Sequence, residues 1–168
     1  MYHGLVVGST FGPGLMPTPA ANINSFKNEV RMMGGYSSGL GELYLSPALM
    51  TAEAWSELAR TIQWSRSKRN IVRDAHWIGG NPGNHEVYGF AAWHATEGGV
   101  MTLHNPDDAR REFRIDHAVA FELPKTLARS FVLISPYADQ RLQSIRIDSD
   151  KPVAITLEPF DVLVFETR

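Results

Sequence analysis

The stretch from His76 to Pro106 constrains the fold more than any other part of this 168-residue chain. It alternates turn residues with strand-forming residues, since Gly79 to Asn84 opens a long loop and Thr96 to Gly99 closes a β-hairpin. Before this stretch the apolar spacing is helical, whereas after it every apolar run is short, alternating or β-branched. We therefore expect two parts, residues 1–70 and residues 71–168.

The first part has the pattern β-α-β-α. The glycine-flanked run Leu5 to Val7 and the run Leu40 to Leu45 are typical of strands buried on both faces of a parallel sheet. Asn22 or Asn24 can cap a helix after the first strand, and the pair Gly34-Gly35 is expected to end it. The apolar stripe of this helix comprises Ile23, Phe26, Val30 and Met33.

Thr51 is expected to start a second helix in the first part. Its predicted apolar stripe contains Trp55, Leu58, Ala59 and Ile62, so Trp55 should be packed against the core. Trp64 lies off that stripe and is expected to cover the second part instead.

The second part consists of short strands separated by turn signals. The predicted strands span 70–78, 85–94, 99–105, 111–121, 130–135, 143–148, 152–158 and 161–167. A spacing of roughly ten residues is typical of an antiparallel β-sandwich or barrel. Polar Arg146 and Asp148 alternate with Ile145 and Ile147, as expected when one face of a sheet is wet. Because no linker separates the two parts, they should pack directly on each other.

Composition and charge exclude several classes of function. The chain has 16 basic and 18 acidic residues and no run of like charges, so nothing points to nucleic acid or an anionic membrane. It has no cysteine, which excludes a disulfide scaffold and a thiolate nucleophile. The loop Gly8 to Gly14 lacks the Gly-Lys-Ser/Thr ending of a phosphate-binding loop, and no cofactor is predicted. The first residues do not resemble a signal peptide, so the protein is either cytoplasmic or its true N-terminus lies elsewhere.

Two consecutive segments resemble a known family. The segments are SPALMTAEAWSELARTIQWSR and HWIGGNPGNHEVYGFAAWHATEGGVMTLHNPDD. Together they look like the C-terminal end of the α-galactosidase-like retaining glycosidases of families 27, 31 and 36 and of large bacterial proteins similar to them. In that family a hairpin of the form G-x-x-x-W, followed by L-x-N-P, opens a β-sandwich, and Gly89 to Trp93 and Leu103 to Pro106 match it. The resemblance implies that residues 1–70 are the last two units of a (β/α)8 barrel and residues 71–168 a sandwich.

The resemblance also implies a function, and it implies that the catalytic residues of the family lie outside this chain. Such glycosidases use two carboxylates on middle strands of the barrel, and this chain contains neither strand. No catalytic residue is therefore transferred, and the isolated chain is expected to be inactive. Three hypotheses remain: the non-catalytic C-terminal portion of a carbohydrate-active enzyme, a stand-alone carbohydrate-binding module, or a small self-associating β-rich protein. The implied partners are a carbohydrate and either an upstream barrel segment or a second copy of the chain; an extracytoplasmic location is also compatible with the resemblance.

Four residues are candidates for contact with a sugar. Glu42, within the last parallel strand, is placed near the carboxyl mouth of a barrel, where it either contacts substrate or is a solvated or hydrogen-bonded carboxylate. Tyr36, Tyr44 and Trp77 either form a platform on which the C–H face of a pyranose stacks or belong to the core.

The histidines and acidic residues do not predict a metal site. His94 and His104 lie on the two arms of one hairpin, but the expected register keeps them several residues apart, and no H-x-H or H-E-x-x-H spacing exists. His76 and His85 lie near the base of the hairpin. Asp107-Asp108 could suggest calcium, but a solvated β-turn is the simpler explanation.

Overall fold

The computed structural model describes residues 3–7, 18–36, 41–123, 130–148 and 151–168. The loop Gly8 to Gly14, for which no phosphate site is predicted, lies outside these residues. The strands are β1 (His3–Val7), β2 (Gly41–Leu45), β3 (His76–Gly79), β4 (Tyr88–His94), β5 (Gly98–His104), β6 (Arg111–Ile115), β7 (Phe131–Ile134), β8 (Ser144–Ile147), β9 (Val153–Leu157) and β10 (Val162–Thr167). The α-helices are α1 (Ile23–Tyr36), α2 (Ala52–Ser67), α3 (Arg69–Val72) and α4 (His117–Ala120), and short 3₁₀-helices span Pro47–Leu49 and Pro82–Asn84.

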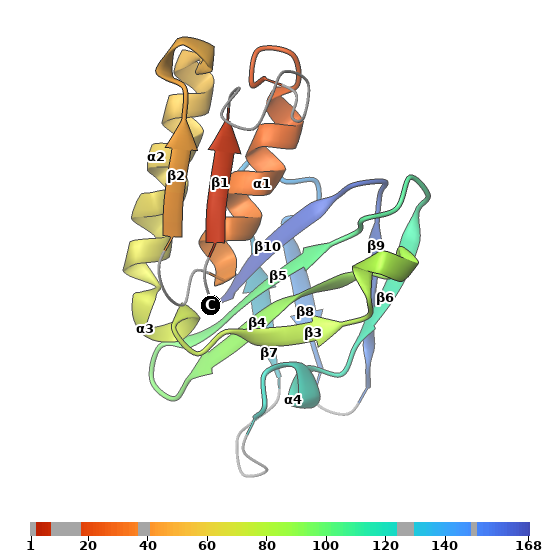
Figure 1. Ribbon diagram of the computed structural model, residues 1–168. Helices are drawn as coiled ribbons and strands as arrows, with labels where there is room; N and C mark the ends of the chain where they lie inside the picture. Colours follow the sequence, from red (N-terminus) through yellow and green to blue (C-terminus); the bar gives the residue numbers. More distant parts are fainter. Residues whose placement is uncertain (1–2, 8–17, 37–40, 124–129, 149–150) are drawn as a thin grey trace.

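The first part has the predicted β-α-β-α order. Strands β1 and β2 pair in parallel from His3–Gly41 to Val7–Leu45, and α1 and α2 pack side by side against them (Figure 1). Asn22 rather than Asn24 caps α1, because its Oδ1 accepts from the Ser25 amide at 3.0 Å. Thr51 caps α2 as predicted, accepting from the Ala54 amide at 3.1 Å.

Two predictions about these helices are wrong. Helix α1 does not end at Gly34-Gly35 but continues to Tyr36. A Cβ at Gly35 would overlap the methyl group of Thr102 on β5, so the glycine lets the helix lie close to the sheet instead of ending it. Trp55 is 43% exposed. The buried stripe of α2 is Ala54, Glu57, Leu58 and Thr61, and it contains polar residues that the apolar pattern missed.

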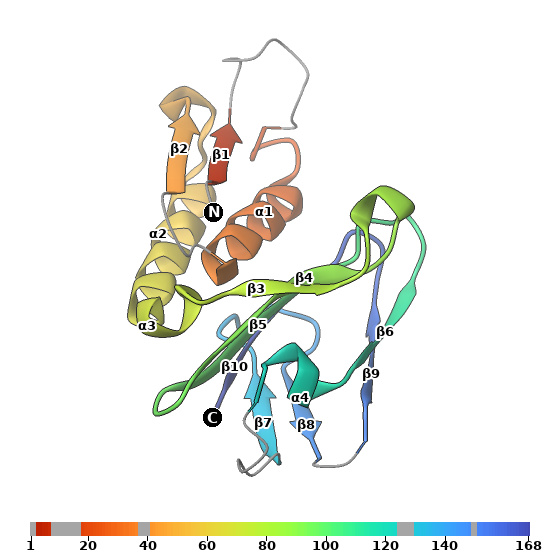
Figure 2. The same ribbon diagram turned by 60° about the horizontal axis from the view of Figure 1, so that its bottom comes forward.

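The second part is an antiparallel β-sandwich, as predicted, and makes the protein mainly β. Six strands form one antiparallel sheet in the order β3-β4-β5-β10-β7-β8, and β6 and β9 form a separate antiparallel pair. Figure 2 shows this pair lying across from the sheet. Buried residues from both layers, among them Met101, Leu103, Phe165, Ile155 and Leu157, meet in the largest hydrophobic core.

Six of the eight predicted strands are confirmed along most of their length, and two are wrong in part. The predicted strand 70–78 begins as helix α3, and strand structure starts only at His76. The predicted strand 111–121 ends at Ile115, because Asp116 accepts from the amides of Ala118 and Val119 and thereby caps α4. The predicted alternation holds, since Ile145, Ile147 and Ile155 are buried whereas Arg146, Asp148 and Thr156 are exposed.

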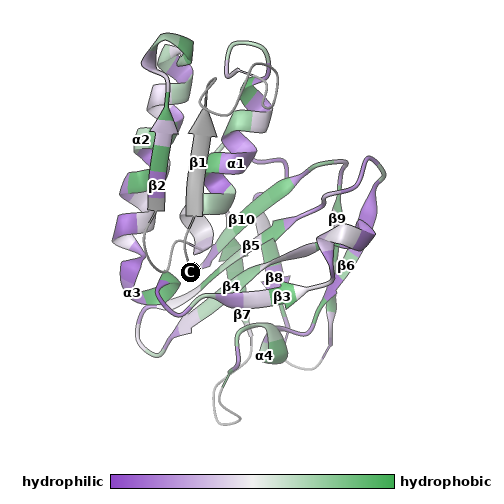
Figure 3. Cartoon of the chain, in the orientation of Figure 1, coloured by the Kyte–Doolittle hydropathy of each residue, from purple (hydrophilic) through white to green (hydrophobic). Residues whose placement is uncertain are grey.

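The two parts pack directly on each other, as predicted. Helix α1 lies over β5 and β10, and Met32 meets Phe90, Val162 and Val164 in a shared core. Trp64 also covers the sheet, and its indole N–H donates to Glu166 at 2.7 Å. Strands β4, β5 and β10 are therefore buried on both faces, and Figure 3 shows β5 and β10 as largely hydrophobic, in contrast to the hydrophilic β6.

The turn after β5 is solvated at Asp108, as predicted, but buried at Asp107, where the prediction is wrong. Asp107 is 6% exposed, and Arg111 Nε donates to its carboxylate at 2.6 Å. The buried Asn105 amide donates to the carbonyls of Ala109 and Glu158 at 2.8 and 2.9 Å. These bonds tie the end of β5 to the end of β9 and explain why polar residues are tolerated inside the fold.

Candidate ligand-binding site

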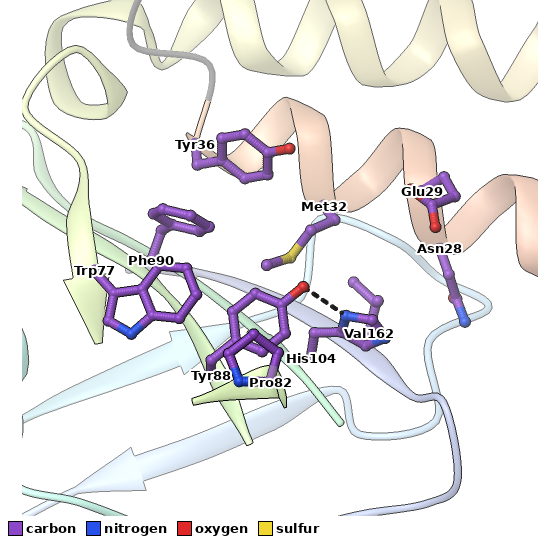
Figure 4. Close-up of a pocket in the computed structure, with 10 residues that line it drawn as sticks. All are labelled: Asn28, Glu29, Met32, Tyr36, Trp77, Pro82, Tyr88, Phe90, His104 and Val162. Carbon is purple, nitrogen blue, oxygen red and sulfur yellow. Dashed lines mark hydrogen bonds between the residues drawn. The ribbon is translucent and has the colours of Figure 1, made fainter. Parts of the chain in front are cut away.

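A cleft lies between α1 and the helix-facing side of the six-stranded sheet (Figure 4). Its volume of about 380 Å³ is within the range of small-molecule sites. One wall is the last three turns of α1, which contribute Met32 and Tyr36, and the other comes from β3, β4, β5 and β10. We refer to this space as the aromatic cleft.

Aromatic rings line the aromatic cleft on the sheet side. Tyr88 and Phe90 are two residues apart on β4 and therefore point to the same face, and Trp77 on β3 pairs with Phe90 in the strand register. The Trp77 indole stacks on Tyr88 with ring centroids 4.8 Å apart and planes at 9°, and it meets the edge of Phe90 at 5.3 Å. Tyr36 reaches down from α1 to within 4.4 Å of Phe90, centroid to centroid.

Trp77 is the exposed member of this group. It is 46% exposed although two other rings, those of Tyr88 and Phe90, pack against it. Because Tyr88 covers one face of the indole, the accessible surface lies on the opposite face and the ring edge. Exposed large aromatic side chains that are held rigidly by neighbours are common in binding sites.

Polar groups occupy the other end of the aromatic cleft. His104 stands opposite Tyr88 in the β4–β5 register, and its Nδ1 lies 3.1 Å from the Tyr88 hydroxyl. Burial lowers the pKa of His104, so the imidazole is neutral at pH 7 although the nearby charge of Asp161 opposes this shift. Glu29, which lines the cleft from α1, has its carboxyl pKa raised by desolvation.

The two tyrosines of the cleft carry protonated hydroxyls throughout the physiological pH range. Burial, together with the negative charge of Glu29, raises the pKa of Tyr36 to about 12. The same two causes raise the pKa of Tyr88. Asn28 completes this end of the cleft, where its amide donates to the Phe160 carbonyl at 2.9 Å. The cleft thus combines aromatic rings with hydrogen-bond donors and acceptors.

The structure brings together only two of the four residues singled out from the sequence. Tyr36 and Trp77 both line the aromatic cleft. Glu42 and Tyr44 lie on β2, away from the residues that line it, and the Tyr44 hydroxyl donates to the Glu42 carboxylate. Glu42 is the second residue of β2, so it lies near the amino end of the strand and not at the carboxyl mouth where it was expected. A role for any of the four in sugar binding stays a prediction.

Sequence reasoning missed Tyr88, Phe90 and Glu29, and it considered His104 only as a metal ligand. Tyr88 and Phe90 alternate with the small residues Gly89 and Ala91 on β4, and this alternation indicates that the two rings lie on the same face of the strand. His104 could have been placed beside Tyr88 from the register of a hairpin closed at residues 96–99.

The described part of the chain contains no group of three or more histidine or acidic side chains that could hold a metal ion. His94 pairs with Gly98 and His104 with Tyr88, so the two histidines lie at opposite ends of the hairpin. None of the helices described above has the length and apolar character needed to cross a membrane.

Comparisons with known proteins reveal similarity only at the level of structure. No protein-family model matches the sequence, and no curated protein matches it significantly. The α-galactosidase I of Mortierella vinacea superposes on 95% of this chain with a TM-score of 0.61 and 12% identity. The α-amylase of Geobacillus thermoleovorans, complexed with acarbose, superposes on 88% with a TM-score of 0.57 and 13% identity. AmyP in complex with maltose superposes on 99% with a TM-score of 0.58 and 11% identity.

These matches show a shared fold and partial coverage. The chain spans 38%, 34% and 39% of the three proteins, respectively. At such low identity the similarity concerns the fold alone, and it agrees with the resemblance drawn from the sequence.

Proposed function

We propose, from the glycoside hydrolase-like fold of this chain, that it is the C-terminal, non-catalytic portion of a carbohydrate-active enzyme. In this role its β-sandwich packs on and supports a β/α barrel, of which β1, α1, β2 and α2 are the last two units. Two of the similar structures are named as an α-galactosidase and an α-amylase, and an α-glycoside is therefore the proposed substrate class of the whole protein.

The open parallel sheet is the observation that carries the proposal. Among the described residues, β1 and β2 pair only with each other. Helices cover the face to which Leu45 points, whereas Tyr44, on the opposite face of β2, is 40% exposed. Parallel sheets are normally covered on both faces, and an unpaired edge readily accepts another strand. Further β/α units are therefore expected to complete this sheet, from upstream or from another chain.

The contacts between the two parts support the role of the sandwich as a buttress. Arg31 of α1 is 5% exposed, and its guanidinium donates to Glu57 of α2 at 2.7 Å and to Asp139 of the sandwich at 2.7 and 2.8 Å. Tyr137, which is fully buried, lies beneath the guanidinium at 4.3 Å and hydrogen bonds to Thr61 at 3.1 Å. A buried network of this kind holds the last barrel units in one orientation on the sheet.

An assay with aryl glycosides tests the non-catalytic role. The purified chain is expected to hydrolyse neither aryl α-galactosides nor aryl α-glucosides above background. Reproducible turnover that is lost in the Glu42→Gln variant would overturn the proposal and identify a small enzyme.

Two other functions are each supported by one feature. A stand-alone carbohydrate-binding module is supported by the exposed Trp77. A small self-associating β-rich protein is supported by the open edge of the β1–β2 pair, which a second copy could cover. Sedimentation of the purified chain distinguishes them, because only the self-associating protein should form a defined oligomer.

A further inference from the structure

We infer that one flank of α2 is the docking surface for a further α-helix, whose contact face carries apolar residues at one end and acidic residues at the other. The inference rests on the proposed function, since this helix would belong to the β/α unit whose strand pairs with β2. It adds to that function where the missing unit docks and which side chains its helix presents.

The docking surface consists of residues that follow one another at spacings of four, three and four positions along α2 and therefore share one side of the helix. We call this side the free flank; it comprises Trp55, Ala59, Ile62 and Arg66. Trp55 is 43% exposed, Ala59 and Arg66 are exposed as well, and Ile62 is only partly buried. The apolar pattern of the sequence predicts that Trp55 is packed, whereas the structure leaves this side of α2 uncovered.

The opposite flank of α2 is already occupied by α1. There Glu53 forms an ion pair with Lys27 at 2.7 Å. Glu57 forms one with Arg31 at the same distance. Helix α1 lies on the β1 side of the parallel strand pair and α2 on the β2 side (Figure 1). The free flank of α2 therefore lies toward the open edge of β2.

The topology makes a helix the expected occupant of the free flank. A parallel strand that pairs with β2 is joined to its next strand by a crossover, which is usually an α-helix and right-handed. This handedness places the new helix in the layer of α1 and α2, beside the free flank. Leu43 indicates the same gap in the helical layer, because it points to the side of β2 on which Leu45 packs against the helices and yet is 43% exposed.

The charges at the end of the free flank indicate what the incoming helix carries. Arg66 is followed by Arg69 and Arg73 at spacings of three and four residues, at which like charges on a helix destabilise each other. All three arginines are exposed, and none forms an ion pair with a described residue. The helix macrodipole favours cations at this end of α2, but it does not remove their mutual repulsion. Acidic side chains on the incoming helix would both remove the repulsion and pair with the guanidinium groups.

A second copy of the chain is a poorer match for the free flank. The free flank of the copy carries Arg66 and no acidic residue, because Glu53 and Glu57 face α1. Whether the two α2 helices ran parallel or antiparallel, the arginine of one copy would therefore meet no acidic side chain on the flank of the other. Charge complementarity favours a helix of different sequence.

Oxidation by hydroxyl radicals, measured by mass spectrometry, tests the inference on the protein as it occurs in its source. The native species and the purified 168-residue chain receive the same radical dose, and oxidation is measured at Trp55 and Trp77. We expect Trp55 to be oxidised severalfold more slowly in the native species, because the docked helix covers it. Trp77, which is 46% exposed and lies on β3, is the matched control and should react equally in both samples.

Charge-reversal variants test the acidic end of the contact. Arg66→Glu should lower the unfolding midpoint of the native species and should change that of the purified chain far less, because Arg66 has no ion-pair partner among the described residues. Arg146→Glu, at an exposed arginine on β8, is the control and should change neither midpoint appreciably. Trp55→Ala should act in the same direction as Arg66→Glu.

Three outcomes would overturn the inference. The first is equal oxidation of Trp55 in the native species and in the purified chain. The second is oxidation of Trp55 that slows as the concentration of the purified chain rises, which would assign the free flank to a second copy. The third is that Arg66→Glu and Arg146→Glu lower the midpoint of the native species equally. The first and third leave the proposed C-terminal role standing, because the mass of the native species decides that role separately.

Discussion

Replacing Arg31 with methionine should destabilise the protein more than any change to its charged surface. Methionine keeps the apolar bulk of the arginine stem and removes the guanidinium. The substitution removes the bonds to Glu57 and Asp139 and the contact with the Tyr137 ring. The carboxylate of Glu57, whose side chain is 3% exposed, is then left with Arg60 as its remaining ionic partner.

The expected cost follows from burial. Removing one partner of a buried ion pair typically costs about 3–5 kcal/mol, because the remaining charge is still shielded from water. Arg60 compensates in part, so we expect a loss of about 3 kcal/mol. The Arg60 side chain is itself 44% exposed, and Arg60→Met should therefore cost only about 1 kcal/mol or less.

Urea unfolding followed by tryptophan fluorescence measures both changes. Arg31→Met should lower the unfolding midpoint strongly and Arg60→Met slightly. The double variant Arg31→Met with Glu57→Leu should recover most of the loss, since no buried charge remains. Equal midpoints for the two single variants, or a double variant less stable than Arg31→Met, would refute the assignment of this network as the junction between the two parts.

Two further predictions concern the same junction. Gly35→Ala should destabilise the protein by about 1–3 kcal/mol in urea unfolding, because the new methyl group overlaps Thr102 and must push α1 away from β5; an unchanged midpoint would show that α1 can shift without loss. Acid should weaken the junction. Desolvation by itself would raise the pKa of Asp139, but the hydrogen bonds and charges of Arg31 and Lys27 outweigh it and lower this pKa from 3.8 to about 2. A depressed pKa of this kind stabilises the fold at neutral pH, and this stabilisation disappears as the pH falls from about 4 to about 2. Asp139→Asn should therefore lose stability at pH 7 and show a weaker pH dependence in that interval, whereas an identical acid transition in both proteins would contradict this.

The order of elements could be predicted from the sequence because it depends on local patterns. Period-2 alternation located strands such as β8 and β9, and Thr51 marked the start of α2. Errors arose where tertiary contacts overrode local signals. Gly34-Gly35 looks like a helix end, but Gly34 allows α1 to pack closely on Thr61 of α2 and Gly35 allows it to pack closely on Thr102 of β5. One error had a local cause instead: Asp116 ends β6 early because it caps the short helix α4.

The candidate site was harder to predict than the fold. Trp77 and Tyr36 were identified as aromatic residues near the junction, but Tyr44 was grouped with them although it lies on β2. The cleft is made by α1 crossing over β10, β5 and β4, and the position of a helix on a sheet depends on long-range packing. Buried charges were missed for the same reason, since Arg31 and Glu57 are more than twenty residues apart in the sequence.

The intact mass of this polypeptide in its native source shows whether it belongs to a larger carbohydrate-active enzyme. Immunoprecipitation under native conditions, followed by mass spectrometry, would show both the size of the chain and any protein bound to it. We expect a polypeptide more than twice as heavy as 18.7 kDa, or one of 18.7 kDa in stable association with a chain that supplies further β/α units. A species of 18.7 kDa that occurs alone or only with copies of itself would contradict the claim that it completes a larger carbohydrate-active enzyme.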